Sequence, residues 1–405
     1  MIPEFDATRL ASPVIAKLRA YDPGHDLPAL RQRFGAAIAE LGSNENPLGP
    51  SPRALEAMRA ALPEVLRYPD PRGAALRVAL ANHLDVAGDR IALGNGSHEL
   101  LMLLAQCFAD PAHSVVYSRY GFAVFAIAAA AVGARSVRVP ALARDHTTAP
   151  FGHDLAAMAG AIHDDTRIVY LANPNNPTGT WFDDAMLGDF LARVSPGVLV
   201  VVDEAYHEYV DARGVSTALA LCEKHPNLIV TRTFSKAYGL AGLRIGYMVA
   251  HASVVEVLER LRESFNVNSM ALAAAEAALD DSEHLGRVRE FNTSERAWLR
   301  DGLQARGYTC LPSQTNFLLI DLGRDASDLE RRLFERGVIV RPMGGYGLPQ
   351  TLRISVGHRG ENARFLDALD FVAAESRTDL PSPAGGRKWP EAPEGGDESH
   401  GRFIP

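Results

Sequence analysis

The chain of 405 residues has few cysteines, no long apolar run and no excess of positive charge. Its three cysteines, Cys107, Cys222 and Cys310, lack the spacing of metal ligands, so we expect buried thiols in a reducing compartment and no metal site. The longest apolar run, residues 122–132, is too short to span a bilayer, and the N-terminal residues MIPEFDATRL do not form a signal peptide pattern. A formal net charge of −8 argues against nucleic-acid binding. We therefore expect a cytoplasmic protein without membrane or nucleic-acid partners.

The hydrophobic content of 47% is enough for a large core, and the length exceeds that of one simple domain. Short apolar segments alternate with helical ones between about residues 91 and 249, which predicts a mostly parallel sheet covered by helices on both faces. The mixed section at 317–374 predicts a smaller α+β domain. The predicted fold class is therefore α/β, with a large domain and a small one.

We divide the chain into an N-terminal arm and small-domain segment at 1–50, of which residues 1–40 are expected to be partly helical, a large domain at 51–282 and a small domain at 283–376. A disordered tail is expected at 377–405, because this stretch is charged and rich in proline and glycine. The predicted helices span residues 53–62, 73–84, 98–108, 122–132, 183–194, 217–224, 253–279, 284–306, 326–336 and 361–374. The predicted strands span residues 91–93, 114–117, 136–139, 168–172, 198–202, 228–231, 244–249, 317–321, 338–340 and 352–356.

A lysine follows the apolar strand predicted at 228–231. Sheets of this class bind ligands outside the carboxyl ends of their strands, where partial desolvation would lower the pKa of Lys236 and make its amine a nucleophile. Around it, Thr233 and Ser235 offer neutral donors and Arg244 a forked cation, a set that suits a phosphate. The competing interpretation is an ordinary solvated lysine, so the neighbouring loops decide the matter.

Four further loops follow strands or open helices. Ser97 and His98 begin a helix after two glycines, where free backbone N–H groups bind an anion, although a plain helix cap has the same pattern. Two prolines hold Asn176 in a rigid turn. Asp203 follows the most apolar predicted strand, 198–202, and a carboxylate at the carboxyl end of a central strand is costly unless it is paired or functional. Tyr120 follows another strand, the one predicted at 114–117.

This combination matches the requirements of pyridoxal phosphate. Lys236 would bond covalently to the cofactor, and Asp203 would keep its pyridine nitrogen protonated. Asn176 and Tyr206 would donate to the phenolic oxygen. The phosphate would rest on the donors Ser97, His98, Thr233, Ser235 and Arg244.

Taken in order, these motifs resemble the fold-type I pyridoxal-phosphate aminotransferases and, among them, the histidinol-phosphate aminotransferase family. The resemblance covers about residues 12–375 and is carried by Tyr21-Asp22-Pro23-Gly24, Asn44-Glu45-Asn46-Pro47-Leu48-Gly49, Arg67-Tyr68-Pro69, Gly94-Asn95-Gly96-Ser97, residues 173–179, Asp203-Glu204-Ala205-Tyr206, Ser235-Lys236-Ala237, Gly242-Leu243-Arg244, Asn316-Phe317, Arg341-Pro342 and Leu352-Arg353-Ile354.

The resemblance implies further roles. Tyr120 is similar to the residue that stacks on the cofactor ring. Tyr68 is similar to the tyrosine that reaches the phosphate of the neighbouring subunit's cofactor, which implies a homodimer. Arg353 would anchor the substrate's carboxylate or backbone end, and Arg341 would meet its phosphate. Segments with Tyr21 and Asn44 would line the substrate side.

The implied reaction moves an amino group from histidinol phosphate to 2-oxoglutarate, giving imidazole acetol phosphate and glutamate. Three alternatives stay open: an aromatic amino-acid aminotransferase, a decarboxylase of phosphothreonine type with the same cofactor, and a non-catalytic regulator, which would carry a DNA-binding module before this fold. The chain departs from the family at His98, where an acidic residue is common, at Gly42 and in the tail. Capping, solvation or packing suffices to explain Glu45, Glu99, His207 and Arg232.

Overall fold

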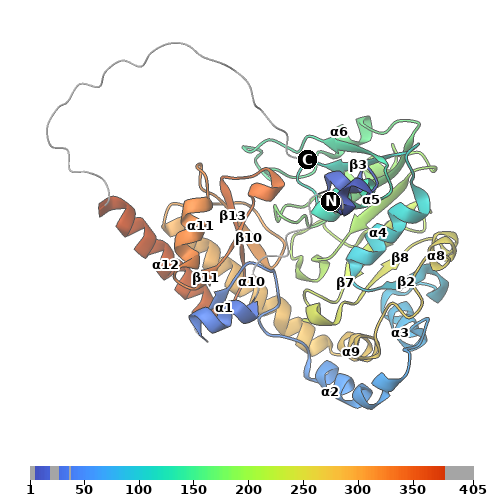
Figure 1. The fold of residues 1–405 in the computed structure, drawn as a ribbon, viewed down its shortest axis with the longest axis horizontal. Coiled ribbons are helices and arrows are strands. Elements are labelled where there is room, and N and C mark those ends of the chain that lie inside the picture. The colour runs from blue at the N-terminus through green and yellow to red at the C-terminus, as the bar shows by residue number, and fades with distance from the viewer. Residues whose placement is uncertain (1–4, 19–26, 36–37, 379–405) are drawn as a thin grey trace, which may run out of the picture.

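The computed structural model describes residues 5–18, 27–35 and 38–378 (Figure 1). Its centre is a seven-stranded sheet with the strand order β2-β8-β7-β6-β5-β3-β4. The strands are β2 (Ile91–Gly94), β3 (Ser114–Ser118), β4 (Arg135–Val139), β5 (Thr166–Ala172), β6 (Leu199–Asp203), β7 (Leu228–Thr233) and β8 (Gly246–Val249). β8 runs antiparallel to both of its neighbours, and the pairs among β3 to β7 are parallel.

Helices cover both faces of this sheet, which confirms the predicted α/β class. Along β5, Ile168 and Tyr170 face the cluster formed with α4 (Ser97–Phe108), α5 (Ala123–Ala131) and α8 (Ala252–Glu259). Val169 and Leu171 face the opposite cluster, formed with α6 (Leu155–Gly160) and α7 (Asp184–Leu191). Alternate residues of a strand point to opposite faces, so a strand buried on both sides is apolar throughout.

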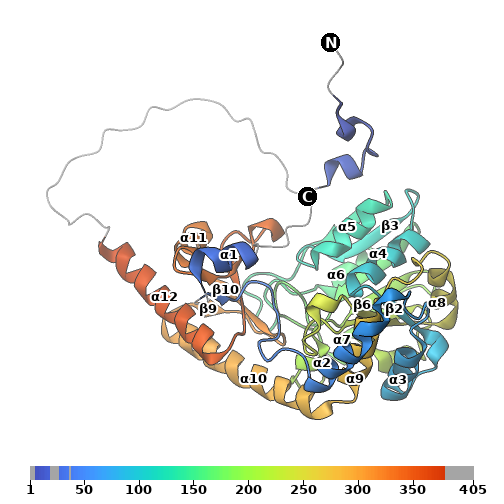
Figure 2. The same ribbon diagram turned by 60° about the horizontal axis from the view of Figure 1, so that its bottom comes forward.

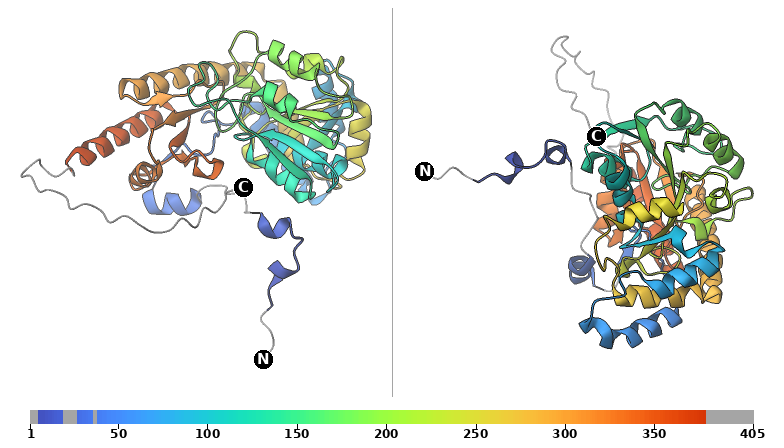
Figure 3. Two further views of the ribbon diagram at one scale, coloured as in Figure 1. Left: turned by 90° about the horizontal axis from the view of Figure 1, so that it is seen from above. Right: turned by 90° about the vertical axis from the view of Figure 1, so that its right-hand side faces the viewer.

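Three helices pack together beside the β2 edge of the sheet: α2 (Pro52–Ala61), α3 (Ala74–Leu84) and α9 (Ser269–Leu279). Ser51 accepts a hydrogen bond from the backbone of Ala54 and so caps α2. The 3-10 helix η3 (Leu62–Leu66) continues from α2 toward the loop that carries Tyr68. Residues 5–18 contain two 3-10 turns, η1 (Ala7–Arg9) and η2 (Ile15–Lys17), whose N-terminal end points away from the rest of the molecule (Figures 2 and 3).

The small domain has a four-stranded antiparallel sheet in the order β12-β13-β10-β9. Its strands are β9 (Thr309–Cys310), β10 (Phe317–Asp321), β12 (Arg341–Pro342) and β13 (Thr351–Ser355), and a separate pair joins β1 (Ala39–Glu40) to β11 (Val338–Ile339). The long helix α10 (Ser282–Ala305) leads from the large domain to the small one, where α11 (Ser327–Phe334) and α12 (Arg359–Thr378) pack (Figure 1). Helix α1 (Leu27–Phe34) joins this group through the Phe34 and Phe334 rings.

Two predicted helices are wrong in extent. The helix expected at 217–224 is only the 3-10 helix η6 (Ala218–Leu221), because its backbone N–H groups bond to oxygens three residues back, as Ala220 does to Thr217 and Cys222 to Leu219. The helix expected at 253–279 is two helices, α8 and α9. The break occurs where Phe265 takes a φ of +60° and the Asn268 side chain caps α9 at Ala271.

Smaller differences concern strand ends and the tail. Thr233 is the last residue of β7 rather than a loop residue, and β8 begins only at Gly246 because Arg244 takes a φ of +58°. Elements α6, β1, β9 and β12 were not predicted, whereas α1 lies in the arm that was expected to be partly helical. Helix α12 runs to Thr378, so the tail predicted to be disordered from residue 377 begins as helix. The remainder of that tail, 379–405, lies outside the described residues, as does Tyr21.

Residue 282, where the large domain was predicted to end, is the first residue of α10, and the exact division into domains stays a prediction. Within the described ranges, no helix combines the length and the apolar character that a membrane span requires.

Candidate active site

Lys236 lies three residues beyond β7, at the carboxyl end of the parallel strands. Its Nζ donates to the backbone oxygens of Asn44, at 3.2 Å, and Ser43, at 3.4 Å. It stands 5.8 Å from the centre of the Tyr206 ring. Burial, followed by the positive charge of Arg353, lowers the pKa of Lys236 to about 8. An amine with such a pKa is partly unprotonated near neutrality and is therefore a competent nucleophile and base.

Asp203 ends β6, two sheet positions from β8, and is almost fully buried. Its Oδ1 accepts a hydrogen bond of 3.1 Å from the Thr231 hydroxyl on the adjacent strand. Burial raises the pKa of Asp203 to about 7, above its usual range. A buried carboxylate with a single side-chain hydrogen bond is suited to pair with a cationic N–H group of a ligand.

Tyr206 and Asn44 form one wall of the site. Asn44 Nδ2 donates to the Tyr206 hydroxyl over 3.0 Å, and burial raises the pKa of Tyr206 so that its proton is retained. Asn44 takes a φ of +55° and is fixed by Ser355, whose hydroxyl accepts from the Asn44 backbone N–H at 2.8 Å and donates to its Oδ1 at 3.1 Å. These bonds connect the N-terminal segment to the small domain at the site.

An anion cradle forms where α4 begins. The Arg244 Nη1 atom donates to Ser235 Oγ at 3.3 Å, and the Thr233 hydroxyl donates to the same oxygen at 3.0 Å. Gly96 has a φ of +83°, and a Cβ atom there would stand 2.4 Å from Arg244 Nη2. Glycine therefore lets the guanidinium approach the first turn of α4, where Ser97 lies. The hydroxyls, the cation and the helix N-terminus together suit a phosphate.

His98 lies beside this cradle on the first turn of α4. Burial and the charge of Arg244 lower the pKa of His98, which favours its neutral imidazole beside the cradle.

Arg353 holds the opposite side of the site. Its Nη1 donates to Asn176 Oδ1 and its Nη2 to the Gly42 oxygen, both at 2.7 Å. Since the Asn176 oxygen accepts from Arg353, its amide nitrogen is the atom that can donate to a ligand. Arg341 is the direct cross-strand partner of Arg353, so the two arginines project from the same face of the small sheet.

Tyr120 and Tyr68, the other two tyrosines predicted to bind the cofactor, differ in their surroundings. Tyr120 is buried and meets Phe151 edge to face at 5.4 Å, in a cluster with Leu319 and Met343 of the small domain. Tyr68 is 82% exposed and stacks on Phe265 with ring centres 4.6 Å apart.

The structure thus brings together the residues predicted around Lys236, on which the charges of Arg353, Arg244 and Asp203 all act. The sequence interpretation missed Ser355 and Thr231, which fix Asn44 and Asp203. The alternation of β13 offered a signal for Ser355, because residues two apart on a strand share a face, as Arg353 and Ser355 do.

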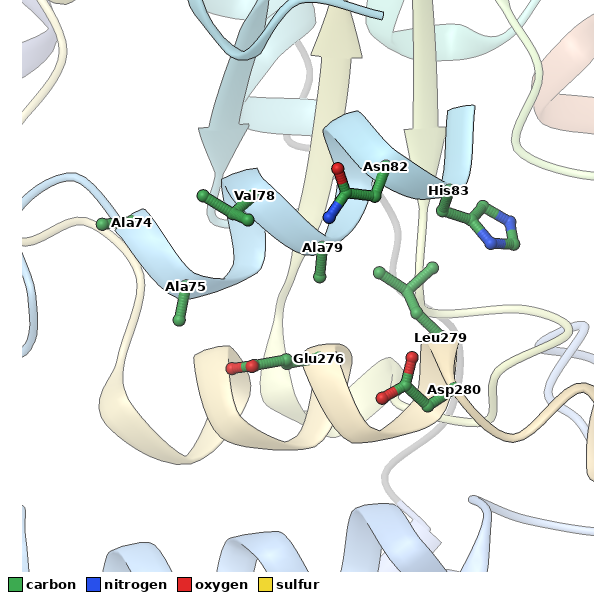
Figure 4. Close-up of a pocket in the computed structure, with 9 residues that line it drawn as sticks. All are labelled: Ala74, Ala75, Val78, Ala79, Asn82, His83, Glu276, Leu279 and Asp280. Atoms are coloured by element: carbon green, nitrogen blue, oxygen red, sulfur yellow. The ribbon is translucent and has the colours of Figure 1, made fainter. Parts of the chain in front are cut away.

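A separate groove of about 760 Å³ lies between α3 and α9, and Figure 4 shows the residues that line it. Val78, His83, Glu276 and Asp280 are among them, and none of the predicted site residues is. Among the described residues, no group of histidine, cysteine and acidic side chains could hold a metal ion.

The aminotransferase class I and II family model matches residues 37–369. Histidinol-phosphate aminotransferase 2 of Pseudomonas aeruginosa is 50% identical over 372 residues, which cover 91% of this chain and 99% of that protein. Histidinol-phosphate aminotransferase 1 of Nitrosococcus oceani is 46% identical over 370 residues, covering 91% and 98%.

Among solved structures, the histidinol-phosphate aminotransferase of Sinorhizobium meliloti in complex with pyridoxal-5'-phosphate matches with a TM-score of 0.82 at 33% identity. That match covers 90% of this chain and 98% of the other. The chain belongs to the class I and II aminotransferases and, within them, to the histidinol-phosphate aminotransferase family.

Proposed function

We propose that this protein uses pyridoxal phosphate to transfer the amino group of histidinol phosphate to 2-oxoglutarate, giving imidazole acetol phosphate and glutamate. The choice of histidinol phosphate as substrate rests on one observation, the pairing of Arg341 with Arg353 on one face of the small sheet. Two forked cations side by side suit a donor with two polar ends, one of them a phosphate. The names of the relatives from Pseudomonas aeruginosa and Sinorhizobium meliloti support the same substrate.

The side chains at the site fit the cofactor. The cradle of Ser97, Ser235 and Arg244 would hold its phosphate, since Gly96 keeps the space beside Arg244 open. Asp203 would pair with the pyridine N–H, and Tyr206 and the Asn176 amide would donate to the phenolic oxygen. Tyr120 would stack on the ring. Bound there, pyridoxal phosphate supplies the electron-withdrawing ring that this chemistry requires.

The chain's own groups then perform the proton transfers. Lys236 Nζ would accept the proton from the amine-bearing carbon of the donor and return a proton later, acting as base and then as acid. Its pKa of about 8 lets it serve in both forms near neutrality. Arg353 would bind the backbone end of the donor, or the carboxylate of the acceptor, and so orient the carbon toward Lys236.

We also propose that the active unit is a cytoplasmic homodimer. Around the exposed Tyr68 lie further exposed apolar side chains, Leu62, Val65 and Leu66, of which Leu66 is 76% exposed. An exposed apolar group of this kind, on η3 and the loop that follows it, favours burial against a second copy, which would bring Tyr68 to the partner's cradle. The free cysteines Cys107, Cys222 and Cys310 support a reducing compartment.

One observation favours the aromatic amino-acid alternative. Tyr120 and Phe151 form an apolar cluster with Leu319, Met343 and Leu348, which would also suit a phenyl ring. Specificity constants for histidinol phosphate, phenylalanine and tyrosine, measured with the native protein and Arg341→Gln, separate the two. We expect Arg341→Gln to lower kcat/KM for histidinol phosphate about ten- to a hundredfold, because a charge-assisted pair is lost. Unchanged kcat/KM for histidinol phosphate would refute the phosphate role of Arg341, and a native preference for phenylalanine would establish the alternative.

A further inference from the structure

Glu99 lies in the first turn of α4, beside the anion cradle, and is fixed by two hydrogen bonds. Its Oε2 atom accepts from the backbone N–H of Asn95 at 2.6 Å and from the Asn266 amide at 2.7 Å. The Asn266 amide also reaches the Leu93 oxygen at 3.3 Å. Asn266 belongs to the segment between α8 and α9, so it joins that segment to the start of α4.

The same asparagine is bound on its other side by Arg262. Arg262 Nη1 donates to Asn266 Oδ1 at 2.7 Å, and Arg262 Nη2 donates to the Pro71 oxygen at 2.9 Å. A salt bridge of 2.8 Å to Glu259 orients the guanidinium, whose side chain is only 10% exposed. These bonds carry the connection from Asn266 to the loop that contains Tyr68.

A ring contact makes a second connection to that loop. Phe265, next to Asn266 in the chain, stacks on Tyr68 with ring centres 4.6 Å apart and planes 21° apart. Its φ of +60° lies in the left-handed region, which side chains other than glycine rarely adopt. Neighbouring contacts therefore hold this segment in one conformation.

The electrostatic consequence concerns the cradle. A carboxylate in the first turn of a helix opposes a phosphate bound at that N-terminus, unless its position is fixed and its charge is shared with donors. The Asn266 amide is one of those donors, and it holds the Glu99 carboxylate where it also accepts the hydrogen bond from the Asn95 backbone N–H.

We propose that Asn266 is a positioning residue that fixes Glu99 beside the phosphate cradle and couples this cradle to the Tyr68 loop. The proposal rests on the cofactor and dimer of the proposed function, because Tyr68 would serve the partner's site. Each subunit would thus join its own cradle to the loop that completes its neighbour's cradle.

The test uses full-length protein freed of cofactor and measures the Kd for pyridoxal phosphate by equilibrium dialysis. Asn266→Asp keeps the acceptor for Arg262 but places two carboxylates together, so the Kd should rise about tenfold or more. In Glu99→Gln with Asn266→Asp, the glutamine amide can donate to the new carboxylate and its oxygen can accept from Asn95, at unchanged net charge. This exchanged pair removes the repulsion between the two carboxylates but not the loss of the bond to Leu93, so its Kd should be at least about threefold lower than that of Asn266→Asp alone.

Two controls separate positioning from folding. Asn227→Asp is the matched control, because the Asn227 amide, like that of Asn266, donates to a backbone oxygen, here that of Val198 at 2.7 Å. This substitution should leave the Kd for pyridoxal phosphate unchanged. The melting temperature of each cofactor-free variant is measured alongside. If Asn266→Asp does not fold, Asn266→Ala takes its place and should weaken binding by a smaller factor.

A native Kd for Asn266→Asp, or no recovery in the exchanged pair, would overturn the positioning role. A native protein that does not bind pyridoxal phosphate would instead refute the proposed function. The coupling is tested by introducing Asn266→Asp into native protein and into Tyr68→Phe and comparing the two increases in Kd. Because substitutions at coupled residues are non-additive, the increase in the Tyr68→Phe background should be smaller by a factor of about three or more. Equal effects in both backgrounds would overturn the link to Tyr68.

Discussion

Lys236 donates to backbone oxygens, and among the described residues no carboxylate forms a salt bridge with its amine. The charges of Glu45 and Asp203 favour the protonated amine, but burial and the charge of Arg353 outweigh them. We expect Lys236→Ala to lose transamination by at least about a thousandfold, because a general base and a nucleophile are removed together. The variant should still bind pyridoxal phosphate through Asp203 and Arg244. Absorbance spectra and single-turnover assays with histidinol phosphate measure both effects. Near-native turnover by this variant would exclude Lys236 as the proton-transfer group.

Because the carboxyl of Asp203 is buried, we expect the stability of the cofactor-free protein to depend on pH. Burial raises its pKa from 3.8 to about 7, so between these values the folded state binds more protons than the unfolded state. Stability therefore falls as the pH rises through this window, by up to about 4 kcal/mol for this residue. Asp203→Asn should raise the melting temperature of cofactor-free protein by a few degrees at pH 8 and change it little at pH 4.

The control for this prediction is the same pair of proteins saturated with pyridoxal phosphate. There the native carboxylate gains a cationic partner, so Asp203→Asn should lower the melting temperature at pH 8. A variant that is less stable at pH 8 in the cofactor-free form would contradict the assigned burial penalty.

At the level of elements, the junction between β2 and α4 depends on a glycine. Only two residues, Asn95 and Gly96, separate the end of β2 from the start of α4, and Gly96 makes this turn with a φ of +83°. Gly96→Ala would strain that backbone and push its Cβ against Arg244. We expect the Kd for pyridoxal phosphate to rise about tenfold or more, as measured by dialysis.

Gly188→Ala is the matched control, since Gly188 lies within α7 and a Cβ atom there would meet no atom within 4 Å. Alanine favours a helix interior, so this variant should keep its cofactor affinity and gain about 0.5–1 kcal/mol of stability. Equal Kd values for the two variants would show that the turn at Gly96 does not shape the cradle.

At the level of the whole molecule, Tyr68 and Lys236 are expected to act in different subunits of one site. Mixing Lys236→Ala with Tyr68→Ala, followed by unfolding and refolding together, should give hybrid dimers with one intact site each. Random pairing would restore about a quarter of native activity, whereas either variant alone stays low. Sedimentation measures the assembly state, and a fully active monomer would refute the shared site.

Some of this architecture follows from the chain alone. Strands β5, β6 and β7 run parallel, so the residues just after them must emerge at one edge of the sheet. Asn176 and Lys236 follow two of these strands and Asp203 ends the third, so their convergence was predictable from local patterns. The apolar character of these strands made the sheet itself predictable, because both of its faces are buried.

The tertiary structure alone decided how the site is closed. Arg353 binds Asn176 across 177 positions of the chain, Asn44 binds Tyr206 across 162, and Asn44 meets Ser355 across 311. No local pattern encodes a pairing over such separations, since it depends on how two domains meet. The left-handed backbone conformation of Asn44, Arg244 and Phe265 could not be predicted from the sequence for a related reason. Residues other than glycine adopt it only when surrounding contacts stabilise it, and these contacts exist only in the folded chain.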